Sequence, residues 1–207
     1  MLGPDGDPEL RAEIAVERWF FRIEGHDEAE KAVAALDPAS ATALQLTGRL
    51  AYSRLLFRRG ARPDDREASE AAYRAGAKAA RTEVERGWIE FHWAVLLDNI
   101  DDDYAAAAPH YDAALAVALS AGDRLLESIT IRHTAGQEQD ADTRIAMLRR
   151  SLHLRGAAGI RPQILAAQAA LAASLPEGDP ERAILTDAFR PGAEELRIGW
   201  LLSDDEG

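Results

Sequence analysis

Two segments of the chain match each other at an offset of 38 residues, and this internal repeat limits the folds that the chain can adopt. Residues 69–79 align with residues 107–117, so that Tyr73 falls on Tyr111 and small residues fall on small ones. A further shift of 37 residues places Leu148 on Tyr111. Similarity at a fixed period indicates stacked copies of one supersecondary unit, because a single copy cannot bury its apolar face alone.

Each period has room for two helices, and the composition favours helices throughout. Alanine is abundant, β-branched residues are sparse, and no alternating pattern is long enough to indicate a strand. Apolar residues recur at helical spacing between breaks at glycine and proline. We therefore predict an all-α fold of antiparallel helical hairpins, stacked as an α-solenoid of about 9–10 helices.

The breaks divide the chain into hairpins, and we expect one domain over residues 1–207. An N-terminal capping hairpin is expected over residues 8–36. The hairpins that follow it are expected over residues 41–85, 88–121, 123–155 and 160–202.

Several residues lead to local expectations. Asp7 is placed to cap the first helix, with Pro8 in its first turn. Gly48 interrupts an apolar helix at a cost of about 1 kcal/mol relative to alanine, so another helix is expected to come close there. Gly87 is expected to separate two helices. Pro109 is expected to kink the helix over residues 101–121 or to delay its start.

Two further breaks lie near the C-terminus. Asp123 is expected to cap a helix that runs to about Thr134. Pro191 and Gly192 are expected to interrupt the last helical stretch, and the tail after Leu202 is expected to fray.

Composition and charge exclude several classes of function. The chain has no cysteine, which excludes disulfides, thiolate metal sites and a cysteine nucleophile. Its net charge is −12, which argues against non-specific binding to nucleic acid and to anionic membranes, and allows a preference for basic partners. Neither a signal peptide in residues 1–7 nor an apolar run of about 20 residues is visible, so we expect a cytoplasmic protein.

The repeat also carries a motif of a small residue, an aromatic residue four positions later and a second small residue three positions after that. Its two copies are Ser69, Tyr73, Gly76 and Ala107, Tyr111, Ala114. Leu44 and Gly48 match the bulky and glycine positions of a first helix, and Pro38 matches a repeat-ending proline. Over residues 27–175 the chain therefore resembles the tetratricopeptide repeat family. The resemblance implies a right-handed superhelix whose first helices line a concave groove.

Carrying the groove positions of that family onto this chain gives a set of mostly polar residues: Gln45, Arg49, Tyr52, His92, Asn99, Thr130, His133 and Gln163. Such side chains can donate and accept the hydrogen bonds that a bound peptide needs. The expected function is a non-catalytic interaction module or adaptor that binds a peptide or a helix of a partner protein. The alternative that these residues merely face solvent stays open, and so does a homodimer.

Two other classes of function also stay open. One is a regulatory protein that senses a ligand or peptide in a pocket inside the superhelix, lined by Arg49, His92 and Trp93. The other is an enzyme that uses His92 or His133 with a carboxylate such as Asp98. No nucleophile elbow, phosphate loop or zinc-protease motif is present, so no catalytic residue, cofactor or metal is expected.

The chain also offers two weaker candidates for a site. The acidic run from Asp98 to Asp103 resembles a calcium loop, but Asp103 and Pro109 stand where the loop needs glycine and glutamate. Four arginines form a cluster: Arg58, Arg59, Arg62 and Arg66. They are expected either to hold a carboxylate or phosphate, or to form a solvated loop that Asp64, Asp65 and Glu67 neutralise.

Overall fold

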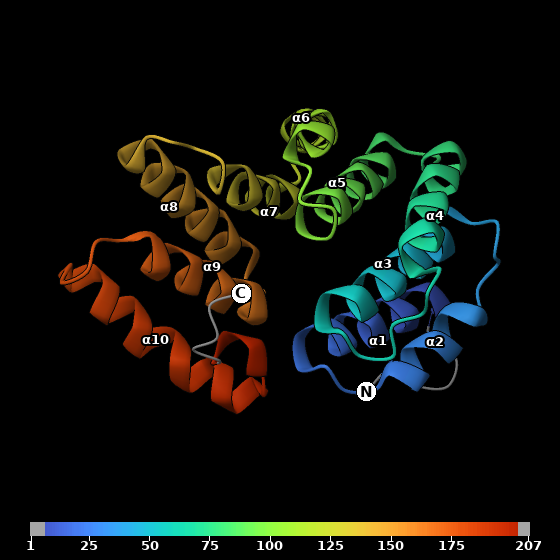
Figure 1. Ribbon diagram of the computed structural model, residues 1–207, viewed down its shortest axis with the longest axis horizontal. Helices are drawn as coiled ribbons and strands as arrows, with labels where there is room; N and C mark the ends of the chain where they lie inside the picture. The colour runs from blue at the N-terminus through green and yellow to red at the C-terminus, as the bar shows by residue number, and fades with distance from the viewer. Residues whose placement is uncertain (1–6, 203–207) are drawn as a thin grey trace. The chain divides into compact units, whose positions relative to one another are not determined.

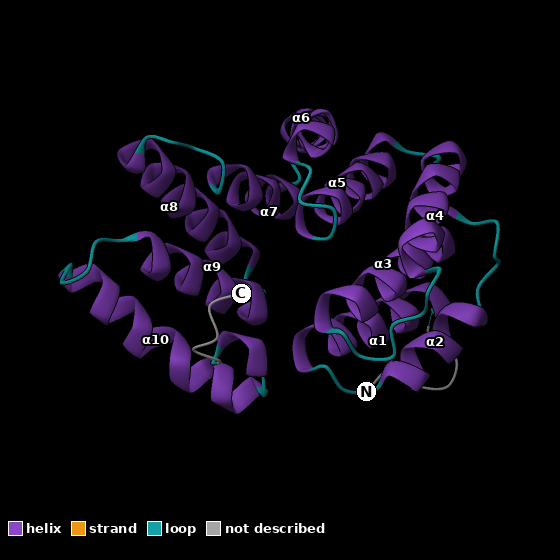
Figure 2. Ribbon diagram, in the orientation of Figure 1, coloured by secondary structure: helices purple, strands orange, loops and turns teal. Residues whose placement is uncertain are grey.

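The computed structural model describes residues 7–202, and in this range the chain is built from helices and loops alone (Figures 1 and 2). The expectations for the first residues and for the tail lie outside the described residues. The α-helices are α1 Pro8–Arg22, α2 His26–Ala34, α3 Ala41–Phe57, α4 Asp65–Ala79, α5 Glu83–Asn99, α6 Tyr104–Ala121, α7 Arg124–Ala135, α8 Ala141–Ala158, α9 Arg161–Ser174 and α10 Pro180–Leu196, followed by the short 3-10 helix η1 Gly199–Leu201.

The chain divides into two compact units, Met1–Val117 and Ala118–Gly207, and the division falls inside α6. We call them unit 1 and unit 2. In unit 1, α1 packs on α2, α3 packs on α4, and α3 also contacts α1 and α5. In unit 2, successive helices from α7 to α10 pack on one another. The predicted all-α architecture of antiparallel hairpins is confirmed, and the single domain stays a prediction.

Side-chain caps fix several helix starts where the sequence placed them. The Asp7 carboxylate accepts a hydrogen bond from the backbone N–H of Glu9 at 2.9 Å, and Pro8 begins α1. The Asp123 carboxylate accepts from the N–H groups of Leu125 and Leu126 at the start of α7. These hydrogen bonds confirm both expected caps. Each such cap contributes about 1 kcal/mol to stability.

The boundary between α4 and α5 differs from the prediction. Helix α4 ends at Ala79 and α5 begins at Glu83, while Gly87 is buried inside α5 instead of separating two helices. Thr82 accepts from the N–H of Glu85 at 3.1 Å, and the Glu85 carboxylate accepts from the N–H of Thr82. This reciprocal capping box sets the start of α5, so the predicted boundary between residues 85 and 88 is wrong.

Neither of the two internal prolines ends a helix. Helix α6 begins at Tyr104, later than predicted, and continues through Pro109. Helix α10 continues through Pro191 and Gly192, so the predicted interruption there is wrong. A Cβ atom at position 192 would lie 2.8 Å from a methyl carbon of Leu165, which shows that glycine is present for close packing on α9.

The expected close approach at Gly48 is confirmed. A Cβ atom there would lie 2.5 Å from Cε1 of Tyr73, a ring that is fully buried. The Ser69 hydroxyl donates to the carbonyl of Gly48 at 2.9 Å across the same contact. Tyr111, the repeat partner of Tyr73, is also fully buried, so both copies of the motif serve in packing.

We expect Gly48→Ala to lower the free energy of unfolding by about 1–3 kcal/mol, because the added methyl group overlaps the Tyr73 ring and forces it to move. The matched control is Gly156→Ala in α8, where a Cβ atom meets nothing within 4 Å. That change should raise the free energy of unfolding by about 0.5–1 kcal/mol. Urea denaturation of both variants is the measurement, and equal effects would contradict the packing account.

An internal ion pair joins α3 to the start of α4. Arg54 and Asp65 are 5% and 1% exposed, and Nε of Arg54 lies 3.0 Å from each carboxylate oxygen of Asp65. The backbone N–H of Arg62 donates to the same carboxylate at 2.7 Å. Burial alone would raise the pKa of Asp65, but the hydrogen bonds from Arg54 and from the Arg62 N–H outweigh it and lower the pKa.

Asp65→Asn should lower the free energy of unfolding by about 3 kcal/mol at neutral pH, because it leaves the Arg54 cation with less compensation. A lowered folded-state pKa gives stability that is full above the unfolded pKa of about 3.9 and is lost as the pH falls through the folded value. The gap between wild type and variant should therefore shrink below about pH 4. Thermal melts over a pH series test this, with the exposed neighbour Asp64→Asn as control. A gap that does not change with pH would contradict it.

Candidate functional site

Five of the predicted groove residues lie in unit 1 on two neighbouring helices. Gln45, Arg49 and Tyr52 follow one another at spacings of four and three residues, which places them on one face of α3. His92 and Asn99 are seven residues apart, which places them on one face of α5. Helices α3 and α5 contact each other directly.

The structure joins these residues in two pairs. The side-chain amide nitrogen of Gln45 lies 3.1 Å from Nδ1 of His92, and the amide of Asn99 donates to the Tyr52 hydroxyl at 2.8 Å. Each pair joins residues 47 positions apart. Equal offsets mean that α3 and α5 run parallel in register, so the pairs lie two helical turns apart, or about 10.5 Å. We call Gln45, Tyr52, His92 and Asn99 the polar ladder. Tyr52 is only 5% exposed, so its hydroxyl positions the Asn99 amide and is not itself open to a ligand.

The ring of His92 is held from several sides. It stacks on Tyr73 and on Trp88, at centroid distances of 6.3 and 5.9 Å. Its Nδ1 lies 2.7 Å from the backbone carbonyl of Trp88. The same Nδ1 lies 3.1 Å from the side-chain nitrogen of Gln45, so it stands between α3 and the backbone of α5. The side-chain oxygen of Gln45 has no bonded partner among the described residues.

An acidic face of α1 borders the ladder at α3. Glu9, Glu13 and Glu17 lie four residues apart and share one side of α1. The Glu17 carboxylate accepts from Arg49 at 2.6 Å, and the Glu9 carboxylate accepts from the Thr42 hydroxyl at 3.2 Å. Partial burial raises the pKa of Glu13; Arg49 opposes this and the neighbouring glutamates add to it. The Glu13 carboxylate is therefore less favourable in its charged form than a free carboxylate, mainly because it is partly buried.

Glu13→Gln should raise the melting temperature at neutral pH by roughly 1–4 °C, because it removes a charge that burial disfavours and that Glu9 and Glu17 repel. A raised folded-state pKa favours the fold below the unfolded pKa of about 4.3, and this advantage is lost as the pH rises through the folded value. The gain from the substitution should thus vanish below about pH 4. Thermal melts against pH check this, with the exposed loop residue Glu177→Gln as control.

The remaining predicted groove residues belong to unit 2. Thr130 is fully buried and its hydroxyl donates to the Leu126 carbonyl at 2.8 Å, so it has no surface to offer a partner. His133 is half-buried with Nε2 at 3.2 Å from a guanidinium nitrogen of Arg132. Gln163 is half-buried in the first turn of α9. Thr130 is therefore left out of the proposed site, while His133 and Gln163 remain predictions.

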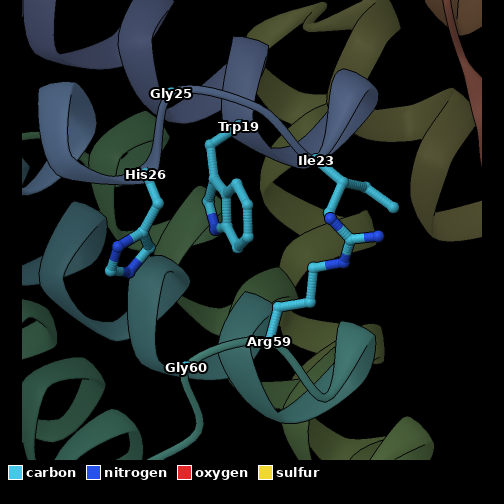
Figure 3. A pocket seen from close by; sticks show the side chains of 6 residues that line it. All are labelled: Trp19, Ile23, Gly25, His26, Arg59 and Gly60. Atoms are coloured by element: carbon cyan, nitrogen blue, oxygen red, sulfur yellow. The ribbon is translucent and has the colours of Figure 1, made fainter.

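A small cavity opens elsewhere in unit 1, between the turn after α1 and the loop after α3 (Figure 3). Its volume is about 260 Å³, and its lining residues are Trp19, Ile23, Gly25, His26, Arg59 and Gly60. In Figure 3 the indole of Trp19 lies between the His26 ring and the Arg59 side chain. Of these residues only Arg59 was predicted as part of a site. The others come together through left-handed turns at Gly25 and Gly60.

Charges of both signs surround this cavity. Arg59 brings a cation, while the two ring nitrogens of His26 lie 3.5 Å from the carboxylates of Asp27 and Glu30. No single class of ligand matches that mixture. None of the residues expected for a pocket inside the superhelix lines the cavity.

The arginine cluster is neutralised mainly by acids other than its nearest neighbours in sequence. Arg62 pairs with Glu30 at 2.6 Å. Arg66 forms ion pairs with Glu70 and with Asp101, whose carboxylate lies 3.0 Å from its Nε. Asp64, Asp65 and Glu67 were expected to neutralise the cluster. Among the described residues only Asp65 contacts it, because its carboxylate accepts from the backbone N–H of Arg62.

Comparisons of the chain with models of protein families, with curated proteins and with solved structures find no match. Membership of the tetratricopeptide repeat family therefore stays a prediction. No helix between residues 7 and 202 has both the length and the apolar character needed to cross a membrane. Over the same range, no three histidine, aspartate or glutamate side chains gather as the ligands of a metal ion would.

Proposed function

We propose that the protein is a non-catalytic interaction module that binds an extended peptide along the polar ladder of unit 1. The observation that carries this proposal is the equal offset of the two hydrogen-bonded pairs on α3 and α5. Equal offsets produce a straight row of polar groups on two parallel helices, which matches the regular spacing of a peptide backbone.

The amides at the two ends of the ladder are suited to hold a main chain. The NH₂ group of Gln45 contacts His92, while its side-chain oxygen has no bonded partner among the described residues and can accept from a peptide N–H. The carbonyl oxygen of Asn99 has no bonded partner among the described residues and can accept from a peptide N–H. An extended chain rises about 3.3 Å per residue, so about three residues of a ligand bridge the 10.5 Å or so between these groups.

Charge favours a basic ligand. Glu9, Glu13 and Glu17 border the ladder, and the only cation among the predicted groove residues of unit 1, Arg49, is already paired with Glu17. A lysine or arginine of the peptide placed beside Glu13 would stabilise the carboxylate that burial disfavours, and would offset the smaller repulsion from its acidic neighbours. The net charge of −12 adds long-range attraction for the same partner.

Selection from a random peptide library tests the proposal. Wild type should enrich peptides that contain lysine or arginine, and the double variant Gln45→Ala/Asn99→Ala should bind an enriched peptide roughly 10–100 times more weakly, since each lost hydrogen bond contributes about 1 kcal/mol. Isothermal titration calorimetry with the synthetic peptide measures the change.

The matched control replaces two amides far from the ladder in sequence, Gln137→Ala/Gln139→Ala, both exposed in the loop between α7 and α8. This variant should bind the selected peptide as wild type does. Equal affinity of both double variants, with both folded by circular dichroism, would overturn the assignment of the ladder as the binding site.

A further inference from the structure

Unit 2 contains a buried arginine whose surroundings the polar ladder of unit 1 does not explain. Arg155 lies in the last turns of α8, is 2% exposed and is the largest fully buried side chain among the described residues. A guanidinium group remains charged in proteins, and taking it out of water is costly unless an anion compensates it.

The Arg155 side chain donates one hydrogen bond within the described residues. Its Nη1 donates to the backbone carbonyl of Gln163 at 3.0 Å. Its Nε is also buried and has no partner, and no carboxylate in the described part of the chain pairs with it. Arg54, the other buried arginine, shows the contrast, because it binds both Asp65 and Glu30. The positive charge of Arg155 thus has a neutral backbone carbonyl as its partner, and no anion pairs with it among the described residues.

The electrostatics of the position agree with this geometry. Burial, together with the nearby cation of Arg132, lowers the pKa of Arg155 to about 9. A pKa of about 9 leaves the group charged at neutral pH. No acidic residue between residues 7 and 202 offsets this cation.

The neighbouring helix adds a second feature that favours an anion. Helix α9 is capped by no side chain, because its N-cap residue is Ile160. Gln163, which contacts Arg155, lies in the first turn of this helix. The first turn offers the backbone N–H groups of Arg161 and Gln163, because Pro162 has none. These groups and the positive end of the helix dipole stabilise an oxyanion that approaches this end of α9.

We propose that unit 2 holds an oxyanion, a phosphoryl or carboxylate group of a ligand, on the Nε edge of Arg155 beside the first turn of α9. The Nη1 group is committed to the Gln163 carbonyl, so the edge that contains Nε is the one left for a two-oxygen contact. Because Nε has no accessible surface, neighbouring side chains must move to admit the anion, which is then enclosed. The site is independent of the polar ladder, and either can fail without the other.

Thermal melts of the whole chain in sodium phosphate, citrate and chloride at matched ionic strength test the proposal. Phosphate or citrate at about 100 times its Kd should raise the melting temperature of wild type by roughly 5–10 °C over chloride. The anion that gives the larger shift identifies the phosphoryl or the carboxylate source. Arg155→Met should show no such shift, and Arg155→Lys, which keeps the charge without the planar fork, should show a smaller one.

The matched control is Arg150→Met, which removes an arginine of the same helix that is exposed and already paired with Glu127. It should keep the full anion response. In chloride, Arg155→Met should melt no lower than wild type, because it removes an uncompensated buried cation. Equal melting temperatures of wild type in all three salts, or a full anion response in both Arg155 variants, would overturn the proposal.

Discussion

The contact between the Tyr73 ring and the backbone of Gly48 is the constraint on which the site in unit 1 depends. Without a side chain at position 48, α4 approaches α3 closely enough for the Ser69 hydroxyl to reach the Gly48 carbonyl. The buried Tyr73 ring then stacks on His92 of α5. That stacking, together with the bond to Trp88, fixes the imidazole that Gln45 contacts. Packing at one glycine thus sets the register of the polar ladder.

The chain handles its two buried arginines in opposite ways. Arg54 is compensated by Asp65 and Glu30, with further support from a backbone N–H, so its burial stabilises the junction of α3 and α4. Arg155 has a single backbone carbonyl instead. Because an uncompensated buried cation lowers stability, its presence is accounted for most simply by an anion that binds there.

Much of the fold could be predicted from local patterns. The repeat placed Tyr73 and Tyr111 at matching packing positions, and both are fully buried. Helical spacing put Gln45 and Tyr52 on one face of α3. Their pairing with residues of α5 could not be predicted from sequence alone. It depends on how α3 and α5 are aligned lengthwise, and no local pattern in the sequence specifies that alignment.

Two further features have a sequence pattern that the predictions did not use, and a third has no such pattern. The spacing of Thr82 and Glu85 is a capping-box signature, and it would have corrected the start of α5. Leu148 and Arg155 are seven residues apart and so share a helix face, which could have marked the arginine as buried. The cavity beside Trp19 had no such signal, because its walls come from two loops that meet only in the folded chain.

The single asparagine of the chain allows the most direct test of the peptide site. Selective ¹⁵N-asparagine labelling gives one side-chain amide in an NMR spectrum, that of Asn99. Titration with a lysine- or arginine-containing peptide selected on wild type should shift this signal and saturate at the stoichiometry measured by calorimetry. An Asn99 signal that stays unchanged while the peptide saturates the protein would contradict binding along the polar ladder.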